Sequence, residues 1–152
     1  MNKSDSLSEK VFFFFQGEWQ IRRRFAGSYE GRLIGNAIFT IDTSLENTYA
    51  YEESGRLETV EGQQFGSKQK YRYCLSGPAI EVLKLENGDW EPMHELNFVE
   101  EGAHIIASHR HLCGEDRYSV VYRIDLTGSF QMSYKVVGPQ KDYLIETQFA
   151  RS

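Results

Sequence analysis

Residues 109–122 read HRHLCGEDRYSVVY, two alternating runs on either side of the turn-forming pair Gly114-Glu115. Successive side chains of a strand point to opposite faces of a sheet, so a hairpin here places every second residue on one face. Two imidazoles, a thiol and two phenols are costly to bury in an apolar core. We therefore predict that this face lines a cavity. Its members are His109, His111, Cys113, Asp116, Tyr118, Val120 and Tyr122.

The same period-two alternation runs through most of the chain and predicts an all-β protein. Turn signals such as Asn87-Gly88 separate short runs that are rich in Tyr, Phe, Val and Ile. About eight to ten such strands, without an internal repeat or a linker, favour a single antiparallel up-and-down barrel. Two packed sheets are the competing architecture. Gly31 and Gly35 fall inside one run and indicate sharp curvature or close approach of the backbone.

The 152 residues fit one domain, which we divide into an N-terminal helical segment, 1–16, and a barrel, 17–152. The apolar run Val11 to Phe15 is too short for a signal peptide or a membrane span. We expect this run to plug one end of the barrel. If its aromatic side chains were exposed instead, they would mark a surface for a partner.

The net charge and the cysteine content of the chain narrow the classes of function that it can have. With 17 Lys and Arg against 22 Asp and Glu, the net charge is −5, which argues against nucleic acid as the main partner. Two cysteines, Cys74 and Cys113, are too few for a disulfide framework, although one bridge between them stays open. We expect a cytoplasmic protein that is not associated with a membrane and is a monomer or a homodimer.

The first and last strands of the predicted barrel carry residues that resemble those of a known superfamily. Gly17-Glu18-Trp19 opens the first strand and Arg151 closes the last. This pair resembles the calycin superfamily, which holds the lipocalins and the fatty-acid-binding proteins. The resemblance implies that Trp19 lies across the barrel floor beneath Arg151, with the cation over the indole face.

The whole chain also resembles one uncharacterised family of lipocalin-like proteins, a domain of unknown function that brings no assigned reaction. Met93, Phe130 and Tyr134 depart from the pattern of that family and would change the shape of the pocket. The residues that carry the resemblance are Gly17-x-Trp19-x-Ile21-x-Arg23, Gly35-x-Ala37-x-Phe39, Tyr51-x-Glu53-x-Gly55, His94-x-Leu96, His111-x-Cys113-x-x-Asp116-x-Tyr118, Gly138-Pro139-x-Lys141-x-Tyr143 and Arg151.

Two pairs of residues could carry chemistry. In the 109–122 hairpin His111 would face Tyr118, either as a proton-transfer pair or, as we prefer, in a static hydrogen bond. Arg23 and Glu53 both point inward in the predicted pattern. A buried charge needs a partner, so they should form an ion pair, or else Arg23 should clamp a charged ligand.

Metal and heme remain alternatives, and we predict no cofactor. His109, His111 and Cys113 could ligate zinc, with His94 or Asp116 as the fourth ligand. Because small barrels of the wider superfamily, nitrobindin among them, hold heme through one histidine, the resemblance implies that His94, His109 or His111 could ligate heme iron.

The sequence favours a protein that binds a small acidic or aromatic molecule in its barrel. An isomerase, cyclase or lyase with His111 and Tyr118 as catalytic pair is the second hypothesis, and a barrel filled by side chains that binds a protein partner is the third. Trp19 and Arg151 are predicted to be structural. The predicted ligand-binding residues are Arg23, Tyr51, Glu53, His94, His109, His111, Tyr118 and Tyr122.

Overall fold

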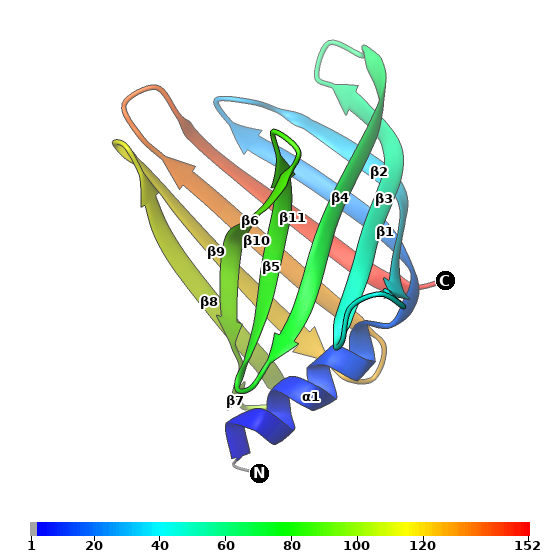
Figure 1. Cartoon of the computed structure of the whole chain (residues 1–152). Coiled ribbons are helices and arrows are strands. Elements are labelled where there is room, and N and C mark those ends of the chain that lie inside the picture. Colours follow the sequence, from blue (N-terminus) through cyan, green and yellow to red (C-terminus); the bar gives the residue numbers. More distant parts are fainter. Residues whose placement is uncertain (1–2) are drawn as a thin grey trace.

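The structure, a computed structural model, describes residues 3–152 and is an all-β fold with one N-terminal helix, α1 (Lys3–Phe15) (Figure 1). This confirms the predicted fold class. Eleven strands follow the helix: β1 (Gly17–Gly27), β2 (Gly31–Ile41), β3 (Thr48–Thr59), β4 (Gln64–Ser76), β5 (Ala79–Glu86), β6 (Asp89–Asn97), β7 (Val99–Glu101), β8 (His104–Cys113), β9 (Asp116–Asp125), β10 (Ser129–Val137) and β11 (Asp142–Arg151).

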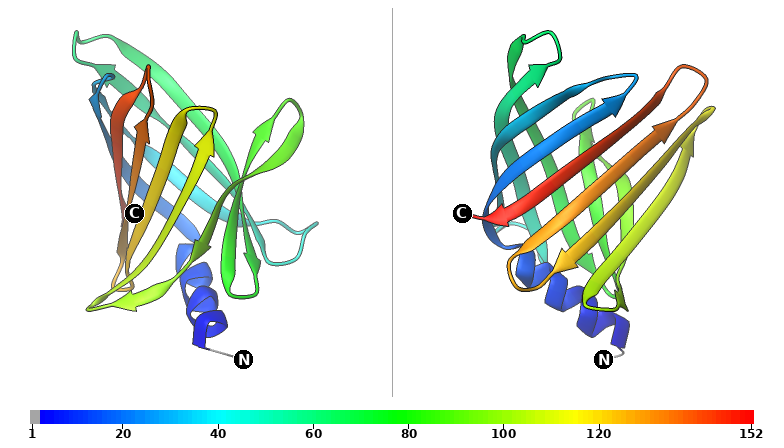
Figure 2. Two further views of the ribbon diagram at one scale, coloured as in Figure 1. Left: turned by 90° about the vertical axis from the view of Figure 1, so that its left-hand side faces the viewer. Right: turned by 180° about the vertical axis from the view of Figure 1, so that it is seen from behind.

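The strands form one antiparallel sheet that curls into a nearly closed up-and-down barrel. Their order is β6-β5-β4-β3-β2-β1-β11-β10-β9-β8-β7, so each strand lies beside its neighbours in the chain, and β1 pairs with β11. The right-hand view of Figure 2 shows β1, β11, β10 and β9 side by side. The described strands thus form one sheet rather than two packed ones. The barrel has one seam, where β6 faces β8 without a hydrogen-bonded ladder.

The strand count exceeds the predicted range of about eight to ten by one short element. β7 spans only Val99–Glu101 and pairs with the start of β8. Alternation cannot be recognised over three residues, and Glu100-Glu101-Gly102 reads as a turn.

α1 lies across one end of the barrel, as Figure 1 shows, and its described part covers that end. Val11 and Phe15 are fully buried, whereas Phe13 is 67% exposed, so the apolar run is not buried as a whole. A helix has more than one face, and only the face toward the barrel can be covered. Residues 1–2 of the predicted segment lie outside the described part. Within that part, no helix has the length and apolar character to span a membrane.

Side chains from the barrel satisfy the C-terminal end of α1. The last carbonyls of a helix lack intrahelical partners. The Trp19 indole N–H donates to the carbonyl of Phe15 over 2.9 Å, and the Tyr49 hydroxyl donates to that of Phe12 over 2.8 Å. The helix is therefore fixed to β1 and β3 by directed bonds as well as by packing.

Above the helix, an aromatic layer fills the lower part of the barrel. The Phe15 and Phe39 rings stack with centroids 5.0 Å apart, and the Phe130 ring stacks on Phe149 at 4.0 Å. Close packing of the backbone supports this layer, because a Cβ built on Gly35 would lie 2.1 Å from the carbonyl oxygen of Ser54. The close backbone approach predicted for Gly35 is confirmed.

Candidate functional site

A cavity of about 400 Å³ occupies the barrel above the aromatic layer. Its size lies within the range of about 300–1,000 Å³ that is typical of small-molecule pockets. Its walls are mainly aromatic and aliphatic, with a few polar groups. The lining residues are Arg23, Phe25, Tyr29, Leu33, Tyr51, Glu53, Leu57, Ser67, Gln69, Tyr71, Tyr73, Met93, His94, Tyr122, Met132, Tyr134, Ile145 and Phe149.

The polar wall of the cavity is built around a buried ion pair. Arg23 donates from both terminal nitrogens to the two oxygens of Glu53, over 2.7 and 3.0 Å. The Arg23 Nε–H donates to the Thr147 hydroxyl over 2.8 Å, and the side chain of Glu53 is only 3% exposed. The ion pair predicted from the sequence is therefore formed, and its bidentate geometry is the strongest that these two groups can make.

Tyr51 completes this network. Its hydroxyl donates to Glu53 Oε1 over 2.6 Å. Burial, together with the neighbouring Glu53 carboxylate, raises the pKa of Tyr51 well above its usual range. The phenol therefore stays protonated and donates to the carboxylate at any pH near neutrality.

A pair of phenols forms the floor of the cavity. The hydroxyls of Tyr73 and Tyr122 lie 2.7 Å apart. Burial raises the pKa of both groups, because a phenolate would lose its hydration. Both side chains are therefore neutral polar contacts at the bottom of the cavity.

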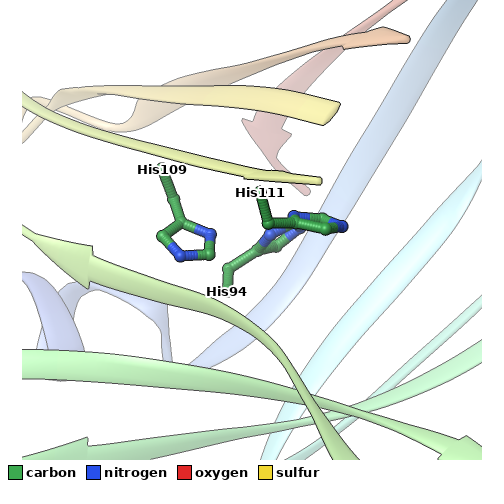
Figure 3. A group of neighbouring side chains, drawn as sticks. All are labelled: His94, His109 and His111. Carbon is green, nitrogen blue, oxygen red and sulfur yellow. The ribbon is translucent and has the colours of Figure 1, made fainter. Parts of the chain in front are cut away.

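Three histidines gather beside the cavity, at the seam of the barrel. His94 comes from β6, and His109 and His111 come from β8, so the seam brings together residues from strands that share no ladder (Figure 3). One possible ligand atom from each of the three lies within 4.8 Å of the others. The His94 ring centroid lies 5.8 Å from that of His109 and 6.3 Å from that of His111.

Burial decides the charge of His94. Loss of solvent, then the neighbouring His109 and His111, lower the pKa of His94 to about 3. The same causes, burial and the nearby His109, lower the pKa of His111. His94 is therefore a neutral imidazole at neutral pH, with a nitrogen lone pair available to a ligand.

The His111–Tyr118 contact differs from the expected hydrogen bond. The two residues are direct partners in the β8–β9 ladder, as predicted, but their rings stack face to face, with centroids 4.8 Å apart and an interplanar angle of 3°. The Tyr118 hydroxyl accepts a hydrogen bond from Lys141 Nζ over 3.2 Å, and Lys141 also pairs with Asp116 over 3.1 Å. Opposed flat rings on neighbouring strands favour stacking over an edge-on hydrogen bond.

The structure thus divides the predicted ligand-binding residues into two groups. The first group lines the cavity and comprises Arg23, Tyr51, Glu53, His94 and Tyr122. The second, His109, His111 and Tyr118, lies beside the cavity and not in its lining. His94 belongs to the cavity lining and to the histidine group. Cys113 is exposed at the end of β8, and neither it nor Cys74 forms a disulfide.

Sequence reasoning missed two features of the site. Gln69, Tyr71 and Tyr73 alternate along β4 and line the cavity, a signal that the sequence carried in its period-two pattern. Lys141 is the second feature, because its amine bridges Asp116 and Tyr118. No local sequence pattern predicts this bridge, because it joins the start of β9 to the turn before β11.

Among solved structures, two similar barrels cover nearly the whole chain. Rv2717c from M. tuberculosis has a TM-score of 0.65 and 13% identity, covering 95% of this chain and 98% of that one. The S-type phycobiliprotein lyase CPES from Guillardia theta has a TM-score of 0.66 and 8% identity, covering 99% and 98%. Identities this low show a shared fold alone.

The sequence has no significant match among curated proteins. The model of one protein family does match it, over residues 15–151. This range takes in the end of α1 and every strand of the barrel. The protein therefore belongs to DUF6314, a family of unknown function.

Proposed function

We propose that this protein binds a small, mainly apolar molecule with an aromatic ring in its barrel cavity. The observation that carries the proposal is the lining of the cavity of about 400 Å³. Tyr71, Tyr134, Met93 and Met132 offer rings and polarisable thioethers, and the polar groups gather around Arg23 and Glu53. Such a division is typical of sites that gain affinity from apolar contact and orientation from a few polar atoms.

The charge of the polar wall favours a neutral ligand over an acidic one. Arg23 already holds the Glu53 carboxylate in bidentate fashion, so a second carboxylate would have to compete with an optimal partner and would meet the charge of Glu53. A hydroxyl, ketone or amide would avoid this conflict. Of the five N–H groups of a guanidinium, three donate to Glu53 and Thr147, which leaves two for an uncharged acceptor.

The competing hypotheses have less support. His111 and Tyr118, the pair predicted for an enzyme, stack on each other outside the cavity lining, and Lys141 occupies the phenol oxygen. Heme in the cavity would depend on His94, whose ring lies against His109 instead of standing apart. A protein-binding barrel filled by side chains would not contain a cavity of about 400 Å³.

The first test is native mass spectrometry of the purified full chain, which would detect a molecule that copurifies. Calorimetric titration with two matched probes then tests the chemistry. 2-Naphthol and 2-naphthoic acid share one ring system and differ in charge at neutral pH. We expect 2-naphthol to bind at least about tenfold more tightly, which corresponds to about 1.4 kcal/mol.

A pair of variants on one strand locates the binding site. Met132→Trp adds an indole to the cavity, whereas Ser133→Trp adds the same group one residue along β10, outside the lining. We expect Met132→Trp to abolish probe binding and Ser133→Trp to preserve it. Binding that survives Met132→Trp, in a protein whose circular dichroism is unchanged, would place the probe elsewhere and contradict the proposal.

A further inference from the structure

Three of the four histidines of the chain meet at the seam, which is the one interruption in the ladder of the described barrel. Figure 3 shows the three imidazoles turned toward one another from β6 and β8. Their ring centroids form a nearly equilateral triangle, with sides of 5.8, 6.3 and 5.8 Å. A triangle of this kind is the arrangement from which three imidazoles can share one ion.

We propose that His94, His109 and His111 bind one divalent transition-metal ion of the zinc class. One ligand atom from each histidine already lies within 4.8 Å of the others. In a tetrahedral site with Zn–N distances of about 2.1 Å, ligand nitrogens lie about 3.4 Å apart. Each nitrogen therefore needs to move by less than about 1 Å toward the centre, which small side-chain rotations supply.

Two buried nitrogens of this group lack a partner among the described residues. They are Nδ1 of His94 and Nδ1 of His109, and His94 as a whole is only 4% exposed. A buried polar atom without a hydrogen bond typically costs about 1–3 kcal/mol. A metal ion at the seam would satisfy lone pairs that the protein leaves unpaired, which gives a physical reason for placing three imidazoles together there.

The donor set decides the class of metal. Three imidazoles without a carboxylate suit Zn²⁺, Ni²⁺ and Cu²⁺, whereas Mg²⁺ and Ca²⁺ require oxygen ligands. Lys84, a cationic side chain that acts on His94, is paired with Glu86 at 3.1 Å. Three histidines leave one tetrahedral position for water or another ligand.

A supporting shell holds one of the ligands in place. The His111 ring stacks on Tyr118, the Tyr118 hydroxyl is held by Lys141, and Lys141 is held by Asp116. The stack restricts the orientation of the His111 ring, and outer-shell groups that orient a ligating histidine raise metal affinity. The proposed set also differs from the zinc ligands considered from the sequence. His94, considered there only as a fourth ligand, becomes one of the three, and Cys113, which is exposed at the end of β8, is left out.

The test uses the full chain, stripped of metal by a chelator and titrated with Co²⁺ and with Zn²⁺. Co²⁺ reports its own geometry, because a site of low coordination number absorbs strongly in the visible range. We expect one ion per chain, and Zn²⁺ should displace Co²⁺ and remove the absorption. The experiment contains no cavity probe, so its outcome is independent of the proposed small-molecule binding.

Substitutions separate this site from other histidine chemistry. His94→Gln, His109→Gln and His111→Gln should each weaken Co²⁺ binding by at least about tenfold. His104→Gln, in the fourth histidine on the same strand as two of the ligands, and Cys113→Ser should leave the affinity within about twofold of wild type.

Each possible result of these titrations either supports or overturns the proposed metal site. If buried His94→Gln fails to fold, the partly exposed His109 and His111 variants carry the test. The absence of stoichiometric binding to the wild-type chain would overturn the proposal. Equal loss in His104→Gln, or binding that survives in the folded His109→Gln and His111→Gln proteins, would also overturn it.

Discussion

The guanidinium carbon of Arg151 lies 3.7 Å from the centre of the Trp19 ring, and the two residues are direct partners across the β1–β11 ladder. The same guanidinium donates to the carbonyl of Gln16 over 2.8 Å and also to that of Phe14. It therefore satisfies the exposed carbonyls at the C-terminal end of α1, where a positive charge also complements the helix dipole. One side chain joins the last strand, the first strand and the helix that plugs the barrel.

We expect Arg151→Gln to lower the free energy of unfolding by about 2 kcal/mol, because it removes a cation–π contact and charge-assisted hydrogen bonds. Arg151→Lys should recover part of this loss, since it keeps the charge but not the planar fork. Urea unfolding followed by tryptophan fluorescence measures both. Arg123→Gln, in an exposed arginine of β9, should change stability by less than about 0.5 kcal/mol. Equal effects of Arg151→Gln and Arg123→Gln would show that the contacts of Arg151 contribute no stability.

Two glycines on the barrel wall offer a matched comparison of backbone packing. A Cβ at position 35 would lie 2.1 Å from the Ser54 carbonyl oxygen and 2.7 Å from the Cα of Gly55, whereas a Cβ at Gly66 would meet nothing within 4 Å. Gly35→Ala should therefore cost about 2–3 kcal/mol as the strands separate. Gly66→Ala should be neutral or stabilise by about 0.4–1 kcal/mol through the unfolded state. Chemical denaturation of both variants checks the difference, and a stable Gly35→Ala protein would contradict the close approach of β2 and β3.

The Arg23–Glu53 pair predicts strong non-additivity. Glu53→Gln leaves a nearly buried guanidinium without its counter-charge and should destabilise the fold by about 3–5 kcal/mol. Replacing both residues, as Arg23→Met with Glu53→Leu, removes the uncompensated charge and should be less harmful than Glu53→Gln alone. A double-mutant cycle measured by urea unfolding gives the coupling energy. Additive losses would mean that the two charges are solvated independently.

The architecture was largely predictable because a barrel wall separates inside from outside at every strand. Alternation identified the inward residues of β1, β3 and β9, and the burial of Trp19, Tyr51 and Tyr122 agrees with it. β7 was not predictable, because three residues show no period. The exposure of Phe13 was not predictable either, because five consecutive apolar residues do not show which face of α1 meets the barrel.

The site was predictable only in part, since it depends on contacts across the seam. Pairing within one hairpin placed His111 opposite Tyr118 correctly. The approach of His94 to His109 joins β6 to β8, which share no ladder, and its geometry depends on the curvature of the whole barrel. Similarly, periodicity gave the direction of Arg23 and Glu53, but the size of the remaining cavity depends on how all the side chains pack.

The phenol pair on the cavity floor predicts a loss of stability in alkali. Burial raises the folded-state pKa of Tyr73 and Tyr122 above the ordinary value of 10.0, so both stay protonated in the native state while the unfolded chain ionises. Their contribution is complete below about pH 10 and is lost as the pH rises above it, by up to about 1.4 kcal/mol per pH unit for each group.

Urea unfolding at several pH values from 9 to 11 should therefore show a steep fall for the wild-type chain. The fall should be shallower in a double Tyr73→Phe, Tyr122→Phe variant, in which neither hydroxyl is left without its partner. Tyr29→Phe, in a tyrosine that is 41% exposed, serves as the control and should keep the wild-type slope. The same slope in all three proteins would mean that the pair ionises normally in the folded state.

The Lys141 bridge links the rim of the barrel to the proposed metal site. Its amine lies at the protein surface, so Lys141→Met should leave the free energy of unfolding nearly unchanged. The variant should nevertheless weaken Co²⁺ binding by about tenfold, because Tyr118 loses the hydrogen bond that fixes it against the ring of His111. Lys135→Met, in an exposed lysine of β10, should alter neither quantity. Cobalt titration and urea unfolding of the same preparations separate the two effects. Unchanged cobalt affinity in Lys141→Met would show that the ring stack orients His111 without help from the lysine.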